Sequence, residues 1–285
     1  MEPKKKLTRR DFLQRGFLAT VGGTGLYAAL LEPEWLALDR LDVPIKDLPP
    51  AFDGYKIAVI SDVHYPRQIE VPFLNRAFDL VKQAKADVLV MPGDFCDGKG
   101  LTKVPALAGV FAMASAPDGV FGVLGNHDHW FDADAVKQEL LGTPIRLIDN
   151  KSVRLSRGGA EIALGGIGDL WCDLIDPERA FEGVPKEMPR ILLSHNPDFA
   201  EDYERDERID LQISGHTHGG EVRLPWGYSP IVPSKYGQKF RAGLASGKSH
   251  RVYTSRGICS PRHVRLFCRP EVSLITLRST AGQDV

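Results

Sequence analysis

Short apolar runs alternate with segments of helical periodicity through the first half of the chain. Residues 56–60 form a β-branched run of strand length, and residues 71–86 repeat apolar side chains at the spacing of one helix face. Further strands are expected at 87–91 and 120–124, with a helix at 102–115 between them. This alternation of strand and helix predicts a parallel sheet within an α/β fold.

The second half of the chain continues the strand pattern with fewer helical segments. Strands are expected at 162–166, 190–193 and 211–213, and shorter ones near 221–223, 251–255, 264–268 and 271–277. Because few helices separate these strands, we expect a mixed sheet. The pattern predicts one domain over residues 55–278, preceded by a proline-rich connector at 32–54 and followed by a tail at 279–285.

Residues 1–31 differ from the rest of the chain in charge. They carry a net charge of +4, whereas residues 32–285 carry -5 and the whole chain -1. Residues 16–31 form an uncharged, moderately apolar stretch that would extend ~24 Å as a helix, less than the ~30 Å hydrocarbon core of a bilayer. A basic region followed by an apolar stretch is typical of an export signal.

Residues 8–14, Thr-Arg-Arg-Asp-Phe-Leu-Gln, resemble the twin-arginine export consensus, with Gln where Lys is usual. The resemblance implies that the twin-arginine machinery exports the protein folded and loaded with metal. Because no Ala-x-Ala site accompanies the motif, we expect an uncleaved membrane anchor with a cytoplasmic N-terminus. The catalytic domain would then lie in the periplasm or at the outer face of the cytoplasmic membrane. The alternative is a buried or amphipathic first helix.

Composition narrows the class of protein. With 43% hydrophobic and 26% charged residues, the chain is not disordered, collagenous or a disulfide framework. Its net charge of -1 argues against a nucleic-acid partner. The four cysteines, Cys96, Cys172, Cys259 and Cys268, include no C-x-x-C pair and do not predict a zinc ribbon, and their number leaves the redox compartment and the disulfide state open.

Polar clusters follow five of the expected strands. They are Asp62-x-His64, Asp94, Asn126-His127-Asp128, His195 and His216-x-His218. Each alone is compatible with an ordinary loop or turn, although residues i and i+2 of an extended segment point to the same side. Ligands collect at the carboxyl ends of the strands in open α/β sheets, so the shared position of the clusters predicts a dinuclear metal site. Imidazole, carboxylate and amide ligands suit two divalent ions, with Mn expected and Fe, Zn, Mg or Ca as alternatives.

The order Asp-x-His, Gly-Asp, Gly-Asn-His-Asp, His and Gly-His-Thr-His resembles that of the calcineurin-like metallophosphoesterases. The resemblance covers residues 55–278 and implies a four-layer αββα sandwich of two mixed sheets flanked by helices. It implies that Asp94 bridges two ions, and that the other ligands are Asp62, His64 and His218 for one ion and Asn126, His195 and His216 for the second. Two-metal chemistry implies in-line attack on phosphorus by a hydroxide held between the ions.

The resemblance also assigns a role to His127. It would be the acid that protonates the leaving oxygen or grips phosphate, oriented by Asp97 or by Asp128. His129 lies one step outside the motif and is expected at the rim. Cys96 is expected to be a small buried residue, with an extra ligand or a redox control as the alternative.

One departure from the family pattern narrows the range of expected substrates. Serine/threonine phosphatases have Gly-Asp-x-Val-Asp-Arg-Gly, whereas residues 93–98 have Gly at the position of that Arg, so protein phosphatase activity is not expected. Nuclease activity is disfavoured by the charge of -5 over residues 32–285.

The chain is similar to bacterial membrane-associated or exported phosphodiesterases, some of which cleave the pyrophosphate of UDP-2,3-diacylglucosamine in lipid A synthesis. The similarity rests on the motif that continues through 219–225, on Ser255-Arg256-Gly257 and on 265–271. It makes Arg223, Arg256 and Arg265 candidates for contact with a diphosphate. The aromatic-rich segment 224–240 is expected either to meet acyl chains or the bilayer, or to pack over the second sheet.

These patterns together predict a metal-dependent phosphodiesterase or pyrophosphohydrolase that acts at the membrane on a lipid-linked or cell-envelope phosphate ester. The alternatives are a non-catalytic metal-binding envelope protein and a phosphomonoesterase of the same fold. UDP-linked lipid precursors are made in the cytoplasm, whereas an exported domain faces away from it. Either the leader serves only as an anchor, or the substrate is another envelope phosphodiester.

Overall fold

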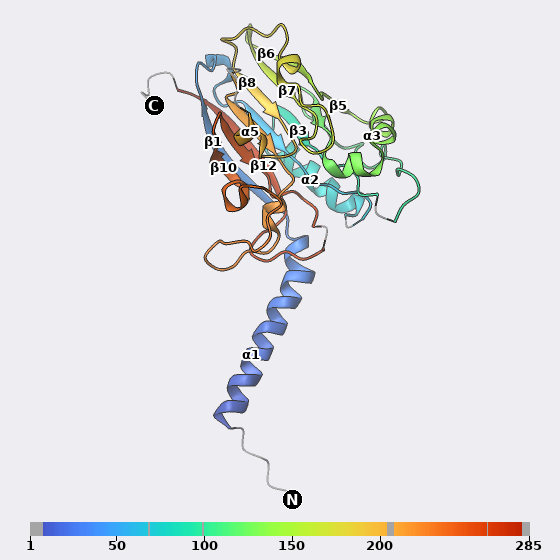
Figure 1. Ribbon diagram of the computed structural model, residues 1–285, viewed down its shortest axis with the longest axis vertical. Helices are drawn as coiled ribbons and strands as arrows, with labels where there is room; N and C mark the ends of the chain where they lie inside the picture. The colour runs from blue at the N-terminus through green and yellow to red at the C-terminus, as the bar shows by residue number, and fades with distance from the viewer. Residues whose placement is uncertain (1–7, 68, 99, 204–207, 261, 281–285) are drawn as a thin grey trace, which may run out of the picture.

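Two six-stranded sheets lie face to face in the computed structural model, which describes residues 8–280 except positions 68, 99, 204–207 and 261 (Figure 1). The first sheet has, in spatial order, β1 (Ala37–Ile45), β12 (Glu271–Ser279), β2 (Lys56–Val59), β3 (Val88–Pro92), β4 (Val120–Val123) and β5 (Ile145–Leu147). The second has β10 (Gly243–Ser246), β11 (Arg251–Thr254), β9 (Leu211–Ser214), β8 (Arg190–Leu193), β7 (Ala160–Gly166) and β6 (Lys151–Arg157).

Both sheets are mixed, as the family resemblance implies, so the parallel sheet predicted from the first half of the chain is completed by an antiparallel strand. In the first sheet β2, β3 and β4 run parallel, with Ala58 opposite Leu89, while β12 runs antiparallel to β2. In the second sheet β8 and β9 run parallel, with Ile191 opposite Leu211, while β10 is antiparallel to β11. The carboxyl ends of β2, β3 and β4 therefore meet at one edge of the first sheet, as do those of β8 and β9 in the second.

The main core lies between the sheets. Ile57, Val90, Phe121, Ile191 and Ile213 are buried there. Each such side chain contributes about 1.5–3 kcal/mol through burial. Helices and loops cover the outer faces of both sheets, so the central strands are apolar on both sides, as expected for strands inside a layered fold.

The helical layers differ in thickness. On the first sheet α2 (Val71–Gln83) presents the apolar face predicted for 71–86 and packs through Phe73, Leu74, Ala77, Phe78 and Val81. On the second sheet α4 (Pro177–Ala180) and α5 (Phe199–Asp202) have only one turn each. A further helix, α3 (Asn126–Leu140), begins directly after β4 and is interrupted at Asp132. Short 3-10 turns complete the description: η3 (Pro50–Phe52), η4 (His218–Gly220) and η5 (Gly237–Phe240).

The helix expected at 102–115 is not formed, and this prediction is wrong. The segment consists of turns, with one helical hydrogen bond from Phe111 N to Leu107 O. Leu107, Phe111 and Ala114 are nevertheless buried against the first sheet. Pro105 and Gly109 disfavour a continuous helix, so the apolar spacing reports the buried face but not the backbone.

Folded structure begins earlier than the expected boundary at residue 55. Part of the stretch expected to be a connector forms β1, which pairs in parallel with β12 from Ala37 opposite Glu271 to Ile45 opposite Ser279. The prolines around this strand suggested a connector, but Pro44 lies in an edge strand, where a missing N–H is tolerated. The strands expected near 221–223 and 264–268 reduce to a single bridge between Val222 and Leu266.

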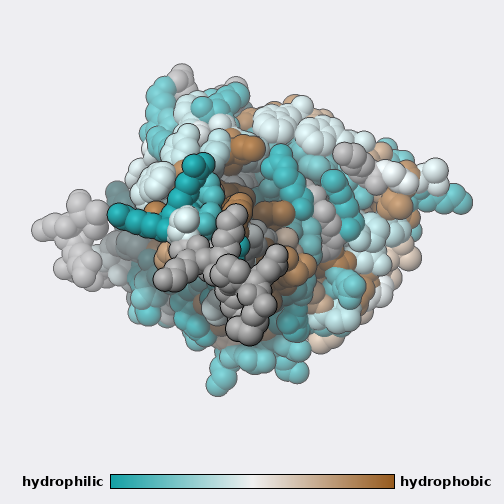
Figure 2. All heavy atoms as spheres, turned by 90° about the horizontal axis from the view of Figure 1, so that it is seen from below, coloured by the Kyte–Doolittle hydropathy of each residue, from teal (hydrophilic) through white to brown (hydrophobic). Residues whose placement is uncertain are grey.

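The helix α1 (Arg9–Leu26) projects from the body, and none of its residues is buried (Figure 1). Figure 2 looks onto the face from which this helix emerges and shows apolar patches among hydrophilic side chains. Within the described part of the chain, no helix combines the length and the hydropathy needed to cross a membrane.

The residues after α1, η1 (Tyr27–Leu31) and η2 (Glu32–Glu34), are integrated into the domain. The side chain of Glu32 is fully buried and accepts hydrogen bonds from the backbone N–H groups of Phe267, at 2.9 Å, and Cys268. Arg265 N donates to Ala28 O at 2.9 Å, and the Arg269 guanidinium lies 4.1 Å from the centre of the Trp35 ring. The end of the leader is therefore fixed to the loop that precedes β12.

Candidate metal centre

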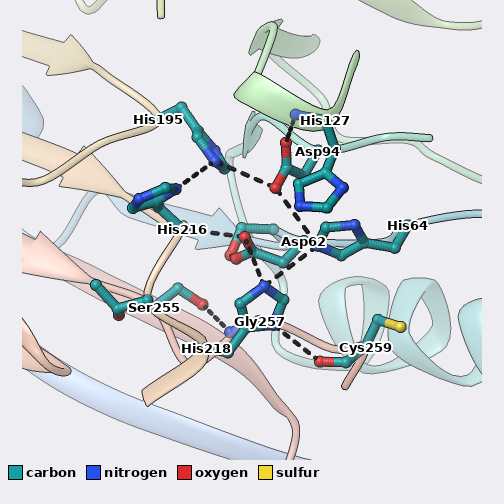
Figure 3. Close-up of polar contacts among 12 residues, drawn as sticks. Asp62, His64, Asp94, His127, His195, His216, His218, Ser255, Gly257 and Cys259 are labelled. Atoms are coloured by element: carbon teal, nitrogen blue, oxygen red, sulfur yellow. Dashed lines mark hydrogen bonds and ion pairs between the residues drawn. The ribbon is translucent and has the colours of Figure 1, made fainter. Parts of the chain in front are cut away.

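The seven side chains expected to bind metal come together at the adjoining edges of the two sheets. Each follows the end of its strand within a few residues: β2, β3 and β4 in the first sheet, and β8 and β9 in the second. Figure 3 shows the imidazoles of His64, His195, His216 and His218 arranged around Asp62 and Asp94. The parallel directions of the strands thus bring distant parts of the chain to one place.

Left-handed backbone turns direct these side chains into the site. Five of the seven residues have positive φ: Asp62 (55°), His64 (49°), Asp94 (57°), His216 (72°) and His218 (51°). The expectation that the i and i+2 pairs sit on extended segments is therefore wrong. For a residue other than glycine this conformation costs roughly 1–2 kcal/mol, which the packed sheets on either side must sustain.

One group of ligand atoms lies around His64. His64 Nε2 is 3.2 Å from His218 Nε2 and 3.4 Å from Asp94 Oδ2. His218 Nε2 is 3.7 Å from Asp62 Oδ1. These four residues each present one ligand atom within 4.8 Å of the others, so they could hold one cation.

The other group lies around His195. His195 Nε2 is 3.3 Å from Asp94 Oδ2 and 3.1 Å from Asn126 Oδ1. His216 Nδ1 is 2.9 Å from the same Asn126 oxygen and 3.2 Å from His195 Nε2. Asp94 Oδ2 therefore belongs to both groups.

The donor atoms fit divalent cations. With metal–ligand bonds of ~2.0–2.2 Å, neighbouring ligand atoms lie roughly 3–3.6 Å apart, which is the spacing found here. His195 Nδ1 lies 2.7 Å from Pro92 O, and His218 Nδ1 lies 3.2 Å from Cys259 O. Because a carbonyl only accepts, each Nδ1 carries a proton, which leaves Nε2 as the ring nitrogen that could bind a cation.

Backbone and hydroxyl groups fix the carboxylates. Asp62 accepts from Ser61 Oγ at 2.6 Å through one oxygen and from His216 N at 2.8 Å through the other. Asp94 Oδ1 accepts from His127 N at 2.9 Å, so its Oδ2 is the oxygen that both groups share. The orientation of Asp94 is thereby set before any ion binds.

The electrostatics favour an anionic carboxylate among imidazoles. Burial alone would raise the pKa of Asp94, but His195 and His64 outweigh it, and the pKa lies well below its usual range. Burial lowers the pKa of His64 and of His216 to about 3, so both are neutral. Burial also opposes the charge of His195, but Asp94 raises its pKa to about 10. A cation bound beside Asp94 would take the place of that proton.

Glycines make room for the two carboxylates. A Cβ on Gly125 would lie 2.2 Å from Asp94 Oδ1, and one on Gly257 would lie 2.8 Å from Asp62 Oδ2. Gly257 has a φ of 67°, and its N–H donates to Ser255 Oγ at 3.0 Å. Ser255 and Gly257 of the Ser255-Arg256-Gly257 motif therefore shape the wall behind Asp62.

His127 has Asp97 beside it rather than Asp128. His127 Nδ1 is 3.8 Å from Asp97 Oδ2. The buried carboxylate of Asp128 instead accepts from Cys96 N and Gly125 N, both at 2.9 Å, and so caps α3. Burial and then Asp94 raise the pKa of Asp128 to about 7. The expectation that Asp128 could orient His127 is therefore corrected in favour of Asp97.

The three arginines expected to contact a diphosphate make contacts within the fold. Arg256 pairs with Asp39 at 2.5 Å and with Glu271 at 2.6 Å. Arg265 is fully buried and donates to backbone carbonyls, among them Cys268 O at 3.1 Å. Arg223 donates to Gly219 O at 3.2 Å. In the described structure none of them lines the cleft over the metal ligands, so their expected role is not supported.

A cleft of about 370 Å³ opens over Asp94, Asn126, His127, His216 and His218. Its other lining residues include several that the motifs did not single out, among them Arg67, Trp130, Trp171 and Arg262. Arg67 follows the first ligand pair and donates to Asp97 Oδ2 at 2.7 Å. Its place in the loop that carries Asp62 and His64 was the one sequence signal for it.

The aromatic-rich segment 224–240 is divided between the surface and the interior. Phe240 is fully buried, Trp226 is 75% exposed, and Ile231 lines the cleft.

All four cysteines are free thiols. Cys96 is buried, and burial raises the pKa of its thiol, in keeping with a small packed residue. His129 does not line the cleft, and its Nε2 lies 3.7 Å from Asp173 Oδ2.

The fold and this arrangement of ligands are those of a phosphoesterase. Residues 55–220 match the family model for calcineurin-like phosphoesterases. The chain therefore belongs to the calcineurin-like phosphoesterase family and is a phosphoesterase enzyme whose candidate site implies divalent metals.

Relatives of similar length lie within the same family. The chain is 31% identical to YkuE, an uncharacterised metallophosphoesterase of Bacillus subtilis, over 97% of this chain and 99% of YkuE. It is 32% identical to the phosphodiesterase YaeI of Escherichia coli, over 95% of this chain and 99% of YaeI. It is 27% identical to LpxG of Chlamydia muridarum, a UDP-2,3-diacylglucosamine pyrophosphatase, over 88% and 92%.

A solved structure agrees on the fold. The 5'-nucleotidase precursor of Thermus thermophilus superposes with a TM-score of 0.50 at 14% identity, over 78% of this chain. This chain spans about half of that protein, 54% of its length. At this level of identity the likeness concerns the fold alone.

The contact between Gly257 and Asp62 gives a direct test of the wall behind the site. In Gly257→Ala the new methyl group should displace Asp62 and weaken metal binding by about 10–100-fold, the usual effect of disturbing a ligand's support. Gly243 is the matched control, because it also has a positive φ, 82°, but nothing lies within 4 Å of a Cβ built there. Titration calorimetry with Mn²⁺ measures the affinities. Equal losses in both variants would refute the steric explanation.

Proposed function

We propose that this protein is a dinuclear metal phosphodiesterase or pyrophosphohydrolase acting on a lipid-linked or cell-envelope phosphate ester. One observation carries the proposal: a single carboxylate oxygen, Asp94 Oδ2, belongs to two ligand groups beneath an open cleft. Two cations held this way can act on the same phosphoryl group. Mn is the first choice of metal, because nitrogen and oxygen donors without thiolate suit it.

The substrate class is supported by the relatives and by the position of the leader. Two of the relatives are a phosphodiesterase and a pyrophosphatase that acts on a UDP-linked lipid. Arg67 lines both the metal cleft and an adjoining cavity of about 740 Å³, which Pro33 and Glu34 also line. The segment that follows α1 therefore lies next to the cleft, so a membrane-bound leader would hold the cleft near the lipid.

The residues around the cleft take separate roles in substrate binding and proton transfer. When bound, the two ions supply a water nucleophile of lowered pKa and neutralise charge on the phosphoryl oxygens. Arg67 binds a phosphoryl oxygen through its guanidinium. Asp97 lies beside His127 on its Nδ1 side, 3.8 Å away, and stabilises the protonated ring that gives a proton to the leaving oxygen.

A panel of substrates tests this assignment. The Mn-loaded enzyme should hydrolyse bis(p-nitrophenyl) phosphate and UDP-2,3-diacylglucosamine faster than p-nitrophenyl phosphate. Asp94→Asn should lose activity by at least about 100-fold, because both ligand groups lose their shared anion. Turnover of the monoester alone would overturn the diesterase assignment. Two bound ions without any turnover would favour a non-catalytic metal-binding protein.

The role of Arg67 is tested by a matched pair of arginines. Arg67→Ala should lower kcat/KM for the diester by about 10–100-fold through the loss of a charge-assisted hydrogen bond, with Arg67→Lys recovering part of it. Arg76→Ala is the control, because Arg76 lines the adjoining cavity but is 56% exposed and pairs with Glu34. Steady-state kinetics give the values. Equal effects of the two alanine variants would exclude a phosphate contact by Arg67.

We place the enzyme at the membrane, with the leader uncleaved, a cytoplasmic N-terminus and export by the twin-arginine machinery. The supporting observations are the exposed α1 and the buried contacts of Ala28 and Glu32, which cleavage within or beyond η1 would disturb. Mass spectrometry of the protein purified from its own cells should therefore find residues 9–31 attached. A mature N-terminus beyond Leu31 would rule out the anchor.

A further inference from the structure

Two exposed tryptophans stand at the mouth of the metal cleft. Trp130 is 60% exposed and Trp171 is 47% exposed, and both line the cleft. Trp130 lies in α3, one turn after His127, and Trp171 lies in the loop that follows β7. Large aromatic side chains left in water beside a site indicate a binding surface, because burying them would otherwise stabilise the fold.

The two indole rings are stacked at a slight tilt. Their ring centres are 6.2 Å apart and their planes meet at 21°. A flat ring in van der Waals contact with two parallel faces needs them roughly 7 Å apart, since carbon atoms touch at about 3.5–4.0 Å. The gap between the two faces cannot exceed the 6.2 Å between their centres, so the exposed indoles must move apart by at least about 1 Å to admit such a ring.

The pair is tied to the metal ligands on both sides. The Trp171 ring lies 4.4 Å from that of His216, edge to face, and the Trp130 ring lies 4.9 Å from that of His127. A ring held by the indoles would therefore lie next to His127 and His216, the residues expected at the phosphoryl group.

The loop that carries Trp171 is fixed before any ligand binds. Trp171 N donates to Asp169 Oδ1 at 2.9 Å, Asn150 Nδ2 donates to Leu174 O at 2.8 Å, and Asp173 pairs with His129 of α3. Because the loop is held at both sides of Trp171, little ordering remains to be done on binding, which favours affinity.

The geometry points to an aromatic clamp in which Trp130 and Trp171 bind the base of a nucleotide whose phosphate occupies the metal centre. Two nearly parallel indole faces select a flat ring, whereas a flexible acyl chain would pack equally well against aliphatic side chains. This inference rests on the proposed phosphoesterase function and narrows its substrates to nucleoside phosphate esters. The bases stack without hydrogen bonds, so the clamp should tolerate uracil and adenine alike.

Binding of nucleotides and of the same phosphate without a base tests the clamp. Titration calorimetry on the full Mn-loaded chain compares UMP and AMP with ribose 5-phosphate and with inorganic phosphate. UMP and AMP should bind about 10-fold or more tightly than ribose 5-phosphate, the effect expected for stacking of one base. Trp130→Leu and Trp171→Leu should each reduce this preference to about twofold or less, while the affinity for inorganic phosphate stays within about twofold.

The matched control is Trp226→Leu, because Trp226 is 75% exposed but lies outside the residues that line the cleft. It should keep the full preference for nucleotides. Equal affinity of the wild type for UMP and ribose 5-phosphate would overturn the clamp, and so would a preference that survives both leucine variants. Turnover of bis(p-nitrophenyl) phosphate reports the metal centre separately, so its absence with nucleotide preference intact would refute the proposed function and leave the clamp standing.

Discussion

One buried carboxylate has to serve two groups of imidazoles at once. Asp94 Oδ2 lies 3.4 Å from His64 Nε2 and 3.3 Å from His195 Nε2, while Oδ1 is held by His127 N. His195 comes from the second sheet and the other three from the first, so the site exists only where the two sheets meet. The packing between the sheets is therefore the condition on which the chemistry depends.

The left-handed turns at the strand ends are the local cost of that arrangement. Side chains along a continuing strand alternate between the faces of the sheet, whereas Asp62, His64, His216 and His218 all turn toward one centre. Conformations of this kind persist only where the surroundings fix them. Here Ser61 and Gly257 on one side of Asp62, and the hydrogen bond from His216 N, fix that residue.

The sequence predicts this centre well because its signal is local. A polar side chain directly after a short apolar run specifies both its element and its edge of the sheet, so the convergence of the seven candidate ligands could be predicted that way. The backbone conformation was not predicted, because positive φ at a His or Asp leaves no compositional trace. The helix expected at 102–115 and the missed α3 show the same limit, since apolar spacing reports burial more reliably than the hydrogen-bond ladder.

Side chains with distant partners escaped prediction for a different reason. Arg256 was expected at the substrate, but its partner Asp39 lies on β1, a strand that was itself hidden by its prolines. Arg67 and the pair of Trp130 and Trp171 belong to no motif, and only the folded chain brings them to the cleft. The place of the candidate metal ligands was thus predictable from spacing, whereas the other residues that line the cleft required the structure.

The central claim is that two ions share Asp94, and anomalous X-ray diffraction from crystals of the Mn-loaded protein tests it most directly. The account predicts two anomalous peaks, one beside His64 and His218 and one beside His195 and His216, each within bonding distance of the Asp94 carboxylate, at about 2.0–2.2 Å. A single peak, or a second ion bound away from Asp94, would contradict it.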